Sequence, residues 1–328
     1  MRRGFSAWGE SAAQAGDALR REPVRAGLAV AGVVIGIVTV VFVASLLAAL
    51  RSQVALLFRE FGTDNVFAYH RTGDPYQPPS EEEARRRPLE PAFAQALAGG
   101  AHVRDVAVQV IVPSVIGSRV LTARAGGNES DRVLVEGLSA NHFDVTGAEF
   151  AAGRPFTELE DRQAARVCVL GANLARALFG TRASLGREVL LGSERFLVVG
   201  QAAPRRGGFF GENRQDSVMA IPQGTAARLF PEAEETVLYI RAEPGGRDLA
   251  KSEAEGLLRR LRGLRPGQAD DFHLSTADQI IAQFDRLSAL IGLATVGLAA
   301  VSLIIGGIGI ANVMIIGVTE RTREIGLR

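Results

Sequence analysis

The C-terminal stretch that begins at Thr319 carries acidic and basic side chains in alternation. Alternating charges on a short helix are suited to docking into a charged groove on a soluble partner, because opposite charges on the two surfaces attract. Thr319 or Thr322 is placed to cap such a helix, and Gly326 to let the chain turn back toward a membrane. A basic anchor that only fixes membrane topology is the alternative, but it leaves Glu320 and Glu324 without a purpose. The predicted docking residues are Thr319, Glu320, Arg321, Thr322, Arg323, Glu324, Ile325 and Gly326.

The rest of the sequence offers no set of residues for catalysis or for metal binding. No two of the four histidines stand at metal-ligand spacing, and there is no Gly-x-Ser-x-Gly nucleophile motif. We therefore predict no catalytic residue, no metal site and no cofactor-binding site in this chain. The histidines, interpreted as surface or packing residues, are His70, His102, His142 and His273.

The rarest side chains exclude further functions. A phosphate-binding loop needs Gly-Lys-Ser/Thr, whereas Lys251 is the only lysine and follows Ala250, so this sequence does not hydrolyse ATP by that route. Cys168 is the only cysteine of the sequence, which excludes an intrachain disulfide. Its position between two valines predicts that it is a small buried apolar residue. A formal net charge of +1 argues against a nucleic-acid partner.

The docking stretch follows a long apolar run, and this run determines where the stretch lies. From Leu287 to Val318 there is no charged residue, and roughly 20 apolar residues in a helix cross a bilayer, so this run predicts a membrane span. Small residues four apart, such as Ser302 with Gly306 and Gly307 with Ala311, let a second helix approach closely. The predicted packing residues on both spans are Gly32, Gly36, Ser302, Gly306, Gly307, Gly309 and Ala311.

The junction of that run with the charged stretch resembles a known family. Gly-Gly-Ile-Gly-Ile-Ala-Asn, residues 306–312, leads through a few apolar residues into Val-Thr-Glu-Arg-Thr-Arg-Glu-Ile-Gly-Leu-Arg, residues 318–328. This pattern is similar to the signature of the MacB/FtsX-type ABC transporter permeases. The resemblance implies a second transmembrane helix followed by a short cytoplasmic helix that touches the ATPase. A glycine-rich membrane helix with a basic end, unrelated to that family, is the alternative.

A second charge-free run, from Ala26 to Leu50, predicts the first membrane span. It is too long for the core of a cleaved signal peptide, which has about 7–15 apolar residues. The arginines just before it favour a cytoplasmic N-terminus, and two spans then return the chain to the cytoplasm. We expect an interfacial amphipathic helix in residues 1–23, with Trp8 at headgroup level. The membrane spans are expected at 24–50 and 287–318, with an extracytoplasmic domain at 51–286 between them and a cytoplasmic coupling segment at 319–328.

The stretch between the spans has a mixed α/β pattern. The expected strands lie at residues 65–69, 103–112, 217–221, 236–241 and 272–275, and the expected helices at 91–97, 223–230 and 248–264. A proline-rich stretch at 74–91 predicts an exposed loop. Thr276 is placed to cap the helix that enters the second span.

The middle of this stretch carries a second part of the resemblance. Short strand, glycine and helix units between Val133 and Gly200 follow one another in the order typical of the extracytoplasmic domain of the same permeases. Gly180 is expected to end a helix and Gly192 to turn a hairpin. The strands at 217–221, 236–241 and 272–275 are expected to rejoin the sheet begun at 65–112. Residues of about 113–215 would then form an inserted second subdomain.

The predicted fold class is an α+β membrane protein, with two transmembrane helices flanking a mixed α/β extracytoplasmic domain that contains an inserted subdomain. The resemblance implies the permease subunit of an ABC transporter in the bacterial cytoplasmic membrane, which transmits ATPase motion to the extracytoplasmic domain for export. ATP and Mg would be bound by a separate ABC ATPase subunit. A second permease copy, an extracytoplasmic adaptor protein and membrane lipid are the further expected partners. A regulator of a cell-wall hydrolase and a two-span sensor remain alternatives. Family members continue into further spans, before which this sequence ends.

Overall fold

A computed structural model describes residues 23–60, 64–71, 81–116, 118–205 and 213–325 of the chain. It divides into two compact units, Met1–Arg51 with Gln283–Arg328, and Ser52–Ala282. The first unit contains most of two long helices, and the second is a mixed α/β domain, so the predicted fold class is confirmed. The expected amphipathic helix before Pro23 lies outside the described residues, and so does much of the proline-rich loop.

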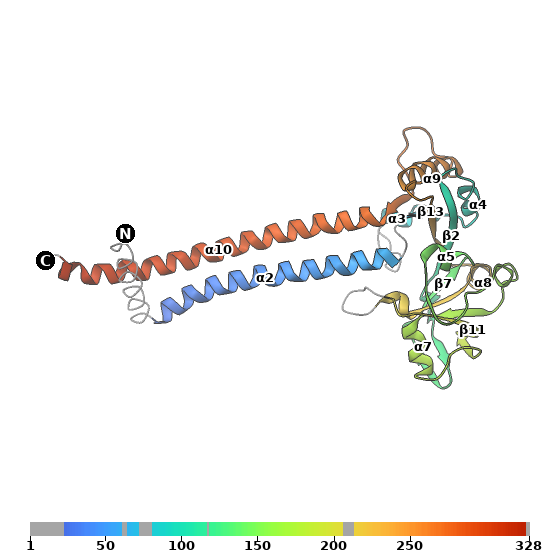
Figure 1. Ribbon diagram of the computed structural model, residues 1–328, viewed down its shortest axis with the longest axis horizontal. Coiled ribbons are helices and arrows are strands. Elements are labelled where there is room, and N and C mark those ends of the chain that lie inside the picture. Colours follow the sequence, from blue (N-terminus) through green and yellow to red (C-terminus); the bar gives the residue numbers. More distant parts are fainter. Residues whose placement is uncertain (1–22, 61–63, 72–80, 117, 206–212, 326–328) are drawn as a thin grey trace. The chain divides into compact units, whose positions relative to one another are not determined.

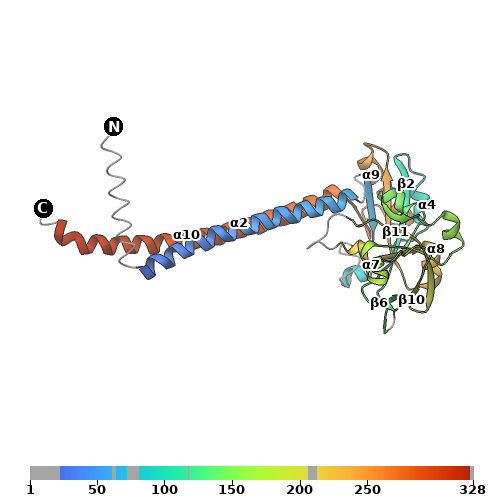
Figure 2. The same ribbon diagram turned by 60° about the horizontal axis from the view of Figure 1, so that its bottom comes forward.

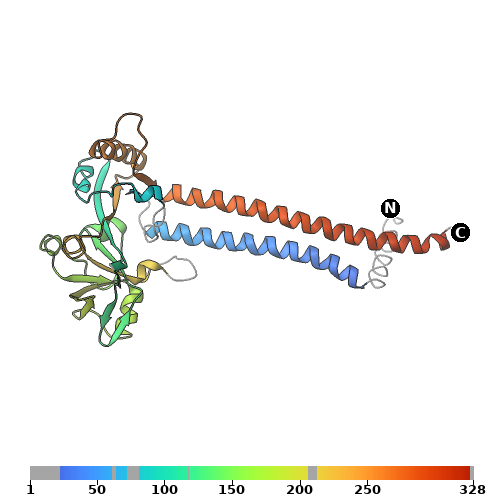
Figure 3. The same ribbon diagram turned by 180° about the vertical axis from the view of Figure 1, so that it is seen from behind.

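Two helices, α2 (Pro23–Glu60) and α10 (Ala277–Ile325), contain the two apolar runs. Each has a segment long and apolar enough to cross a membrane, Val30–Leu56 and Ala277–Asn312. Large aliphatic side chains on both are exposed, as lipid-facing side chains are in a membrane span. The two helices run side by side (Figures 1 and 3) and contact each other.

The domain is built on one mixed β-sheet of 12 described strands. Most neighbours are antiparallel, whereas β7–β12 and β9–β11 are parallel. In sheet order the strands are β14 (His273–Thr276), β1 (Asn65–Tyr69), β13 (Glu235–Ala242), β2 (Val103–Val112), β7 (Leu134–Leu138), β12 (Val218–Pro222), β9 (Val167–Leu170), β11 (Glu194–Ala202), β10 (Glu188–Leu191), β5 (Ala123–Ala125) and β6 (Asn128–Ser130), with β8 (Phe150–Gly153) beside β11. Strands β3 (Val115–Ile116) and β4 (Arg119–Val120) form a separate hairpin.

Short helices cover the sheet on both faces. They are α3 (Glu81–Ala84), α4 (Phe93–Leu97), α5 (His142–Thr146), α6 (Glu158–Arg162), α7 (Ala172–Phe179), α8 (Gln223–Leu229) and α9 (Arg247–Leu261), with a 3₁₀ turn η2 at Arg214–Ser217. Helices α4 and α9 lie at the end of the domain that holds β2 and β13 (Figure 1), whereas α7 lies at the end that holds β11 (Figure 2).

The part of the sheet formed by β14, β1, β13 and β2 has its own apolar core. Alternate residues such as Leu238 and Ile240 point to one face, where they pack with Leu97 of α4 and Leu258 of α9. The intervening residues point to the other face, where Tyr239 packs near Val145 of α5. Successive side chains of a strand point to opposite faces of the sheet, so a strand that is covered on both faces is buried along its length.

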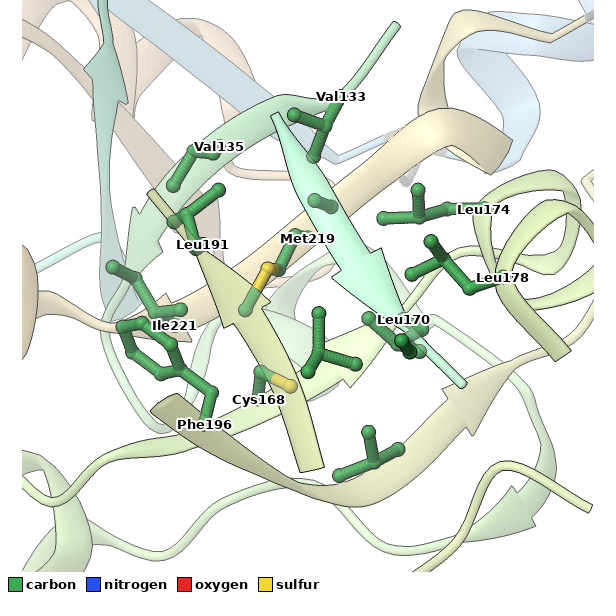
Figure 4. Close-up of a cluster of buried hydrophobic side chains, with 14 of the residues drawn as sticks. Val133, Val135, Cys168, Leu170, Leu174, Leu178, Leu191, Phe196, Met219 and Ile221 are labelled. Carbon is green, nitrogen blue, oxygen red and sulfur yellow. The ribbon is translucent and has the colours of Figure 1, made fainter. Parts of the chain in front are cut away.

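The other part of the sheet has a larger core. On one face Cys168, Phe196 and Met219 pack against Leu174 and Leu178 of α7, as Figure 4 shows. The opposite face, with Val167 and Val169, packs against Phe143 and Phe156. Cys168 has no exposed surface, which confirms the prediction of a small buried apolar residue.

The strands expected to rejoin the sheet begun at residues 65–112 belong to the same sheet as β1 and β2. Strand β12 enters it between β7 and β9, which both belong to residues 113–215. Strand β2 joins the two parts, because it pairs with β13 on one side and β7 on the other. The sheet is therefore continuous, and the chain returns to β1 and β2 only at β13.

Candidate functional site

A regularly spaced stripe of partly buried residues runs along α2. Between Ile35 and Arg51 every position on this helix is exposed except Gly36, Val40, Val43, Leu47 and Leu50. Spacings of four and three keep such residues on one face of a helix that packs against a partner as in a coiled coil. The rest of this segment presents apolar side chains outward.

Helix α10 carries the matching stripe. From Asp285 to Ile308 the non-exposed residues again recur at spacings of three and four, and all but the first are small. They are Asp285, Ser288, Gly292, Thr295, Ala299, Ser302 and Gly306. A stripe without bulky side chains leaves a shallow groove, into which the aliphatic residues of α2 can pack.

The two stripes meet near Gly36. A Cβ atom added to Gly36 would lie 3.5 Å from both the Ala299 carbonyl oxygen and Ser302 Cβ, and one added to Gly32 would lie 3.9 Å from the Ser302 carbonyl oxygen. The backbones thus approach as closely as small residues allow. Gly306 is buried and Gly309 partly buried, whereas Gly307 and Ala311 are exposed. Nothing among the described residues lies within 4 Å of a Cβ added at Gly307.

A second contact between the helices was not predicted. Arg51 Nε lies 2.6 Å from Asp285 Oδ1, and its Nη2 donates to Oδ2 at 3.0 Å, so the guanidinium and carboxylate form a two-point ion pair. Arg51 is the first charged residue after the first apolar run, and Asp285 stands just before the second. Their positions beside the two charge-free runs are the signal from which the pair could have been proposed.

The predicted docking stretch begins inside α10. The helix continues without interruption from Ala277 to Ile325, so Thr319 and Thr322 are interior helix residues. The expectation that one of them caps a separate short helix is therefore wrong, because no residue of the preceding apolar run stops the helix. The side chains of Thr319–Ile325, and the whole of Gly326, lie outside the described residues.

The first turn of α10 is attached to the domain by polar contacts. Thr276 Oγ1 accepts a hydrogen bond of 3.4 Å from the Gln279 backbone, which confirms the predicted helix cap. Arg247 of α9 pairs with Asp278 at 2.5 Å, and Lys251 donates to Gln279 at 2.9 Å. Helix α9 is thereby tied to the start of α10.

The buried polar groups of the domain include a thiol and an imidazole whose pKa values are shifted by burial. Within the described residues, no group of three or more His, Cys, Asp or Glu is placed to hold a metal ion. Burial raises the pKa of the Cys168 thiol, which keeps it protonated and unreactive. Burial, with the positive charge of Arg205, lowers the pKa of His142 to about 3, so this imidazole is neutral. It packs edge-on against Tyr239, with ring centroids 4.7 Å apart.

Comparison with known proteins finds a matching family and related sequences. The family described as the MacB-like periplasmic core domain matches residues 26–257. The macrolide export ATP-binding/permease protein MacB of Chromobacterium violaceum is 31% identical over 315 residues, which cover 95% of this chain and 46% of that protein. MacB 2 of Aeromonas hydrophila is 28% identical over 323 residues, covering 97% and 47%. The chain thus spans about half the length of these curated relatives.

A solved structure supports the fold. The periplasmic region of MacB from Actinobacillus actinomycetemcomitans superposes with a TM-score of 0.54 at 18% identity, over 70% of this chain and 95% of that one. The two apolar helices and the match to the MacB-like periplasmic core domain indicate a membrane protein with an extracytoplasmic α/β domain. The chain belongs to the MacB-like ABC transporter permease family.

Proposed function

We propose that this chain is the permease part of an ABC exporter, in which α10 transmits the motion of an ATPase to the extracytoplasmic domain. The continuity of α10 carries this proposal. One helix of 49 residues begins at the cap of Thr276, contains the apolar run and includes Thr319–Ile325. A continuous α-helix keeps its internal hydrogen bonds when it moves as a body, so it transfers an axial displacement along its length.

The ATPase acts on the cytoplasmic end of α10 in this proposal. Four charged side chains, Glu320, Arg321, Arg323 and Glu324, directly follow the second apolar run. The relatives are named ATP-binding/permease proteins, which supports an ATPase working together with a permease part. At the other end, the Arg247–Asp278 pair gives α10 a firm attachment to α9, so a displacement of α10 reaches the domain.

Reversal of two charges at the cytoplasmic end tests this function. Arg323→Glu with Glu324→Arg, in the full-length protein reconstituted with its ATPase in lipid vesicles, preserves net charge but inverts any docking pattern. We expect loss of the ATPase from the purified complex, or ATP hydrolysis without export. The matched control reverses Glu158 and Arg162, an exposed ion pair of the domain at 2.6 Å. Wild-type binding and export in the Arg323/Glu324 variant would favour the basic-anchor alternative.

The orientation of the domain can be tested separately. Cys168 is buried, so the natural protein should react little with a thiol reagent that does not cross membranes. Ala269→Cys, in an exposed loop between α9 and β14, should react in intact cells whose outer membrane, if any, has been permeabilised. Ala12→Cys should react only after lysis. The reverse pattern would place the domain in the cytoplasm and exclude the proposed function.

A further inference from the structure

The ion pair between Arg51 and Asp285 and the close contact at Gly36 define one alignment of α2 against α10. At 1.5 Å rise per residue, Arg51 lies about 22 Å from Gly36 along α2. Asp285 lies about 21 Å from Ala299 and about 26 Å from Ser302 along α10. The two contacts are thus equally spaced on both helices, and they can be made at the same time only in this antiparallel register.

Packing alone does not select that register. The α10 stripe presents a small residue at every turn, so a shift of one turn, about 5.4 Å, replaces one small residue by another beneath the side chains of α2. Apolar side chains gain little from one alignment over the other where lipid surrounds the helices, because lipid tails are as apolar as the side chains. Smooth helix pairs of this kind need another feature to fix their alignment.

The ion pair has the properties of such a feature. Asp285 is the one charged residue in the α10 stripe, and Arg51 directly follows Leu50 of the α2 stripe. A planar guanidinium with two hydrogen bonds to one carboxylate is directional, so a shift of one turn breaks both bonds. A single polar contact in a helix seam can specify register, and this is the best-attested role of such contacts.

We propose that Arg51 and Asp285 form a register clasp that prevents α2 and α10 from sliding past each other. The consequence rests on the proposed function: when the ATPase displaces α10, the clasp makes α2 move with it. Helix α10 starts directly after β14, and α2 precedes β1, the hydrogen-bonded neighbour of β14. The clasp therefore delivers the displacement to two adjacent strands together, instead of shearing one strand against the other.

Disulfide cross-linking of full-length protein in lipid vesicles tests the clasp without relying on transport. Val43→Cys with Thr295→Cys joins the stripes in the observed register, and Val43→Cys with Ser288→Cys reports a shifted one. Each pair is made in the background of Arg51→Asp, of Asp285→Arg and of both. We expect each single reversal to slow the in-register cross-link about three- to fivefold relative to the shifted one, as for loss of a partly exposed ion pair, and the double exchange to restore it.

Neutral substitutions guard against misfolding. Arg51→Gln and Asp285→Asn remove the charge but keep a polar side chain, and both should slow the in-register cross-link in the same direction. Reversal of the Glu158–Arg162 pair of the domain is the control that should change nothing. Wild-type cross-linking in both single reversals and both neutral variants would overturn the clasp. An altered pattern that the double exchange restores supports it whatever happens to export, and unimpaired export in that case would count against the proposed function instead.

Discussion

The domain and the helix pair are held together in different ways. In the domain the largest buried side chains, such as Phe196 and Leu238, have no exposed surface. In the helix pair the large apolar side chains face outward, with Leu293 and Leu298 each about 70% exposed, and small residues make the contact. The domain buries its large apolar side chains, whereas the helix pair exposes them.

The surroundings explain the difference. In water, burial of apolar area stabilises a fold by roughly 25 cal/mol per Å², so the domain gathers bulky side chains inside. In a bilayer the lipid tails already solvate those side chains, so close backbone packing and polar contacts are what distinguish one helix arrangement from another. The same substitution should therefore have different effects in the two regions.

Truncation of a large apolar side chain to alanine gives the largest expected effect. It tests most directly whether the domain and the helix pair differ in how they hold large side chains. Phe196→Ala should destabilise the domain by about 3–5 kcal/mol, because it leaves a cavity in the core shown in Figure 4. Leu293→Ala, on the outward face of α10, should leave the unfolding of the domain unchanged. Urea unfolding of the detergent-solubilised protein, followed by near-ultraviolet circular dichroism, measures both. Equal loss of stability in the two variants would mean that Leu293 is packed against protein.

Local patterns in the sequence predicted much of the domain. The strands Asn65–Tyr69 and Val103–Val112 have the predicted bounds, because the alternation of side chains is a property of a short window. Gly180 and Gly192 were found for a similar reason: their positive φ angles of 64° and 60° are conformations that favour glycine.

Pairings between distant segments could not be predicted in this way. Strand β12 was located correctly, but its partners β7 and β9 depend on how the chain folds back, which no single window contains. The helix-packing residues were proposed from spacing, but spacing does not say which face meets α2. The Arg51–Asp285 pair joins residues 234 positions apart, and its only local sign is a charge beside each apolar run.

The pH dependence of stability should come from His142 in the domain, and this is the second-largest effect. The pKa of His142 is lowered from 6.5 to about 3, so below pH 6.5 the unfolded chain takes up a proton that the folded chain does not. This difference destabilises the fold by about 1.4 kcal/mol per pH unit, or about 2 kcal/mol at pH 5.

His142→Phe should remove that part of the pH dependence between pH 6.5 and 3. The Nδ1 atom has no hydrogen-bond partner among the described residues, and the phenyl ring retains the edge-on contact with Tyr239. Tyr239→Phe, which keeps the ring and removes only the hydroxyl, is the matched control and should retain the wild-type slope. Urea unfolding at several pH values measures both. A slope unchanged by His142→Phe would assign the pH dependence to other groups.

Bulk added to the helix seam should have a smaller effect, about 1–2 kcal/mol of helix association. Gly36→Leu forces α2 away from Ala299 and Ser302, because even a Cβ atom there would stand 3.5 Å from both. Gly297→Leu, with open space around it, is the control. The rate of the Val43–Thr295 disulfide cross-link compares them, and an equal rate would show that Gly36 is not at a close contact.

Gly307→Leu should leave this cross-link unchanged, and a loss of oligomers in that variant alone would place Gly307 between subunits.

The smallest effect separates two reasons for which a chain needs glycine. Gly36 has a helical backbone, and a position this close to α10 admits only a small side chain. Ala164, after the end of α6, is instead a position where glycine would be favoured for its backbone freedom, because its φ of 48° lies in the left-handed region. Its conformation is fixed from both sides: the Ala164 and Ala165 amides donate to carbonyls of α6, and Arg228 donates to the Ala164 carbonyl. The strain therefore cannot relax by rotation of the backbone.

Ala164→Gly should stabilise the domain by about 0.5–1 kcal/mol. Relief of the left-handed conformation contributes about 1–2 kcal/mol, and the greater freedom of glycine in the unfolded chain costs about 0.5–1 kcal/mol. The control is Ala98→Gly, at an exposed position with an ordinary φ of −64°, where only the entropic cost applies and stability should fall. For a domain of this size the stabilisation amounts to a rise in melting temperature of about 1–4 °C for Ala164→Gly, measurable by thermal unfolding. If both variants lowered the melting temperature alike, Ala164 would carry no strain that glycine relieves.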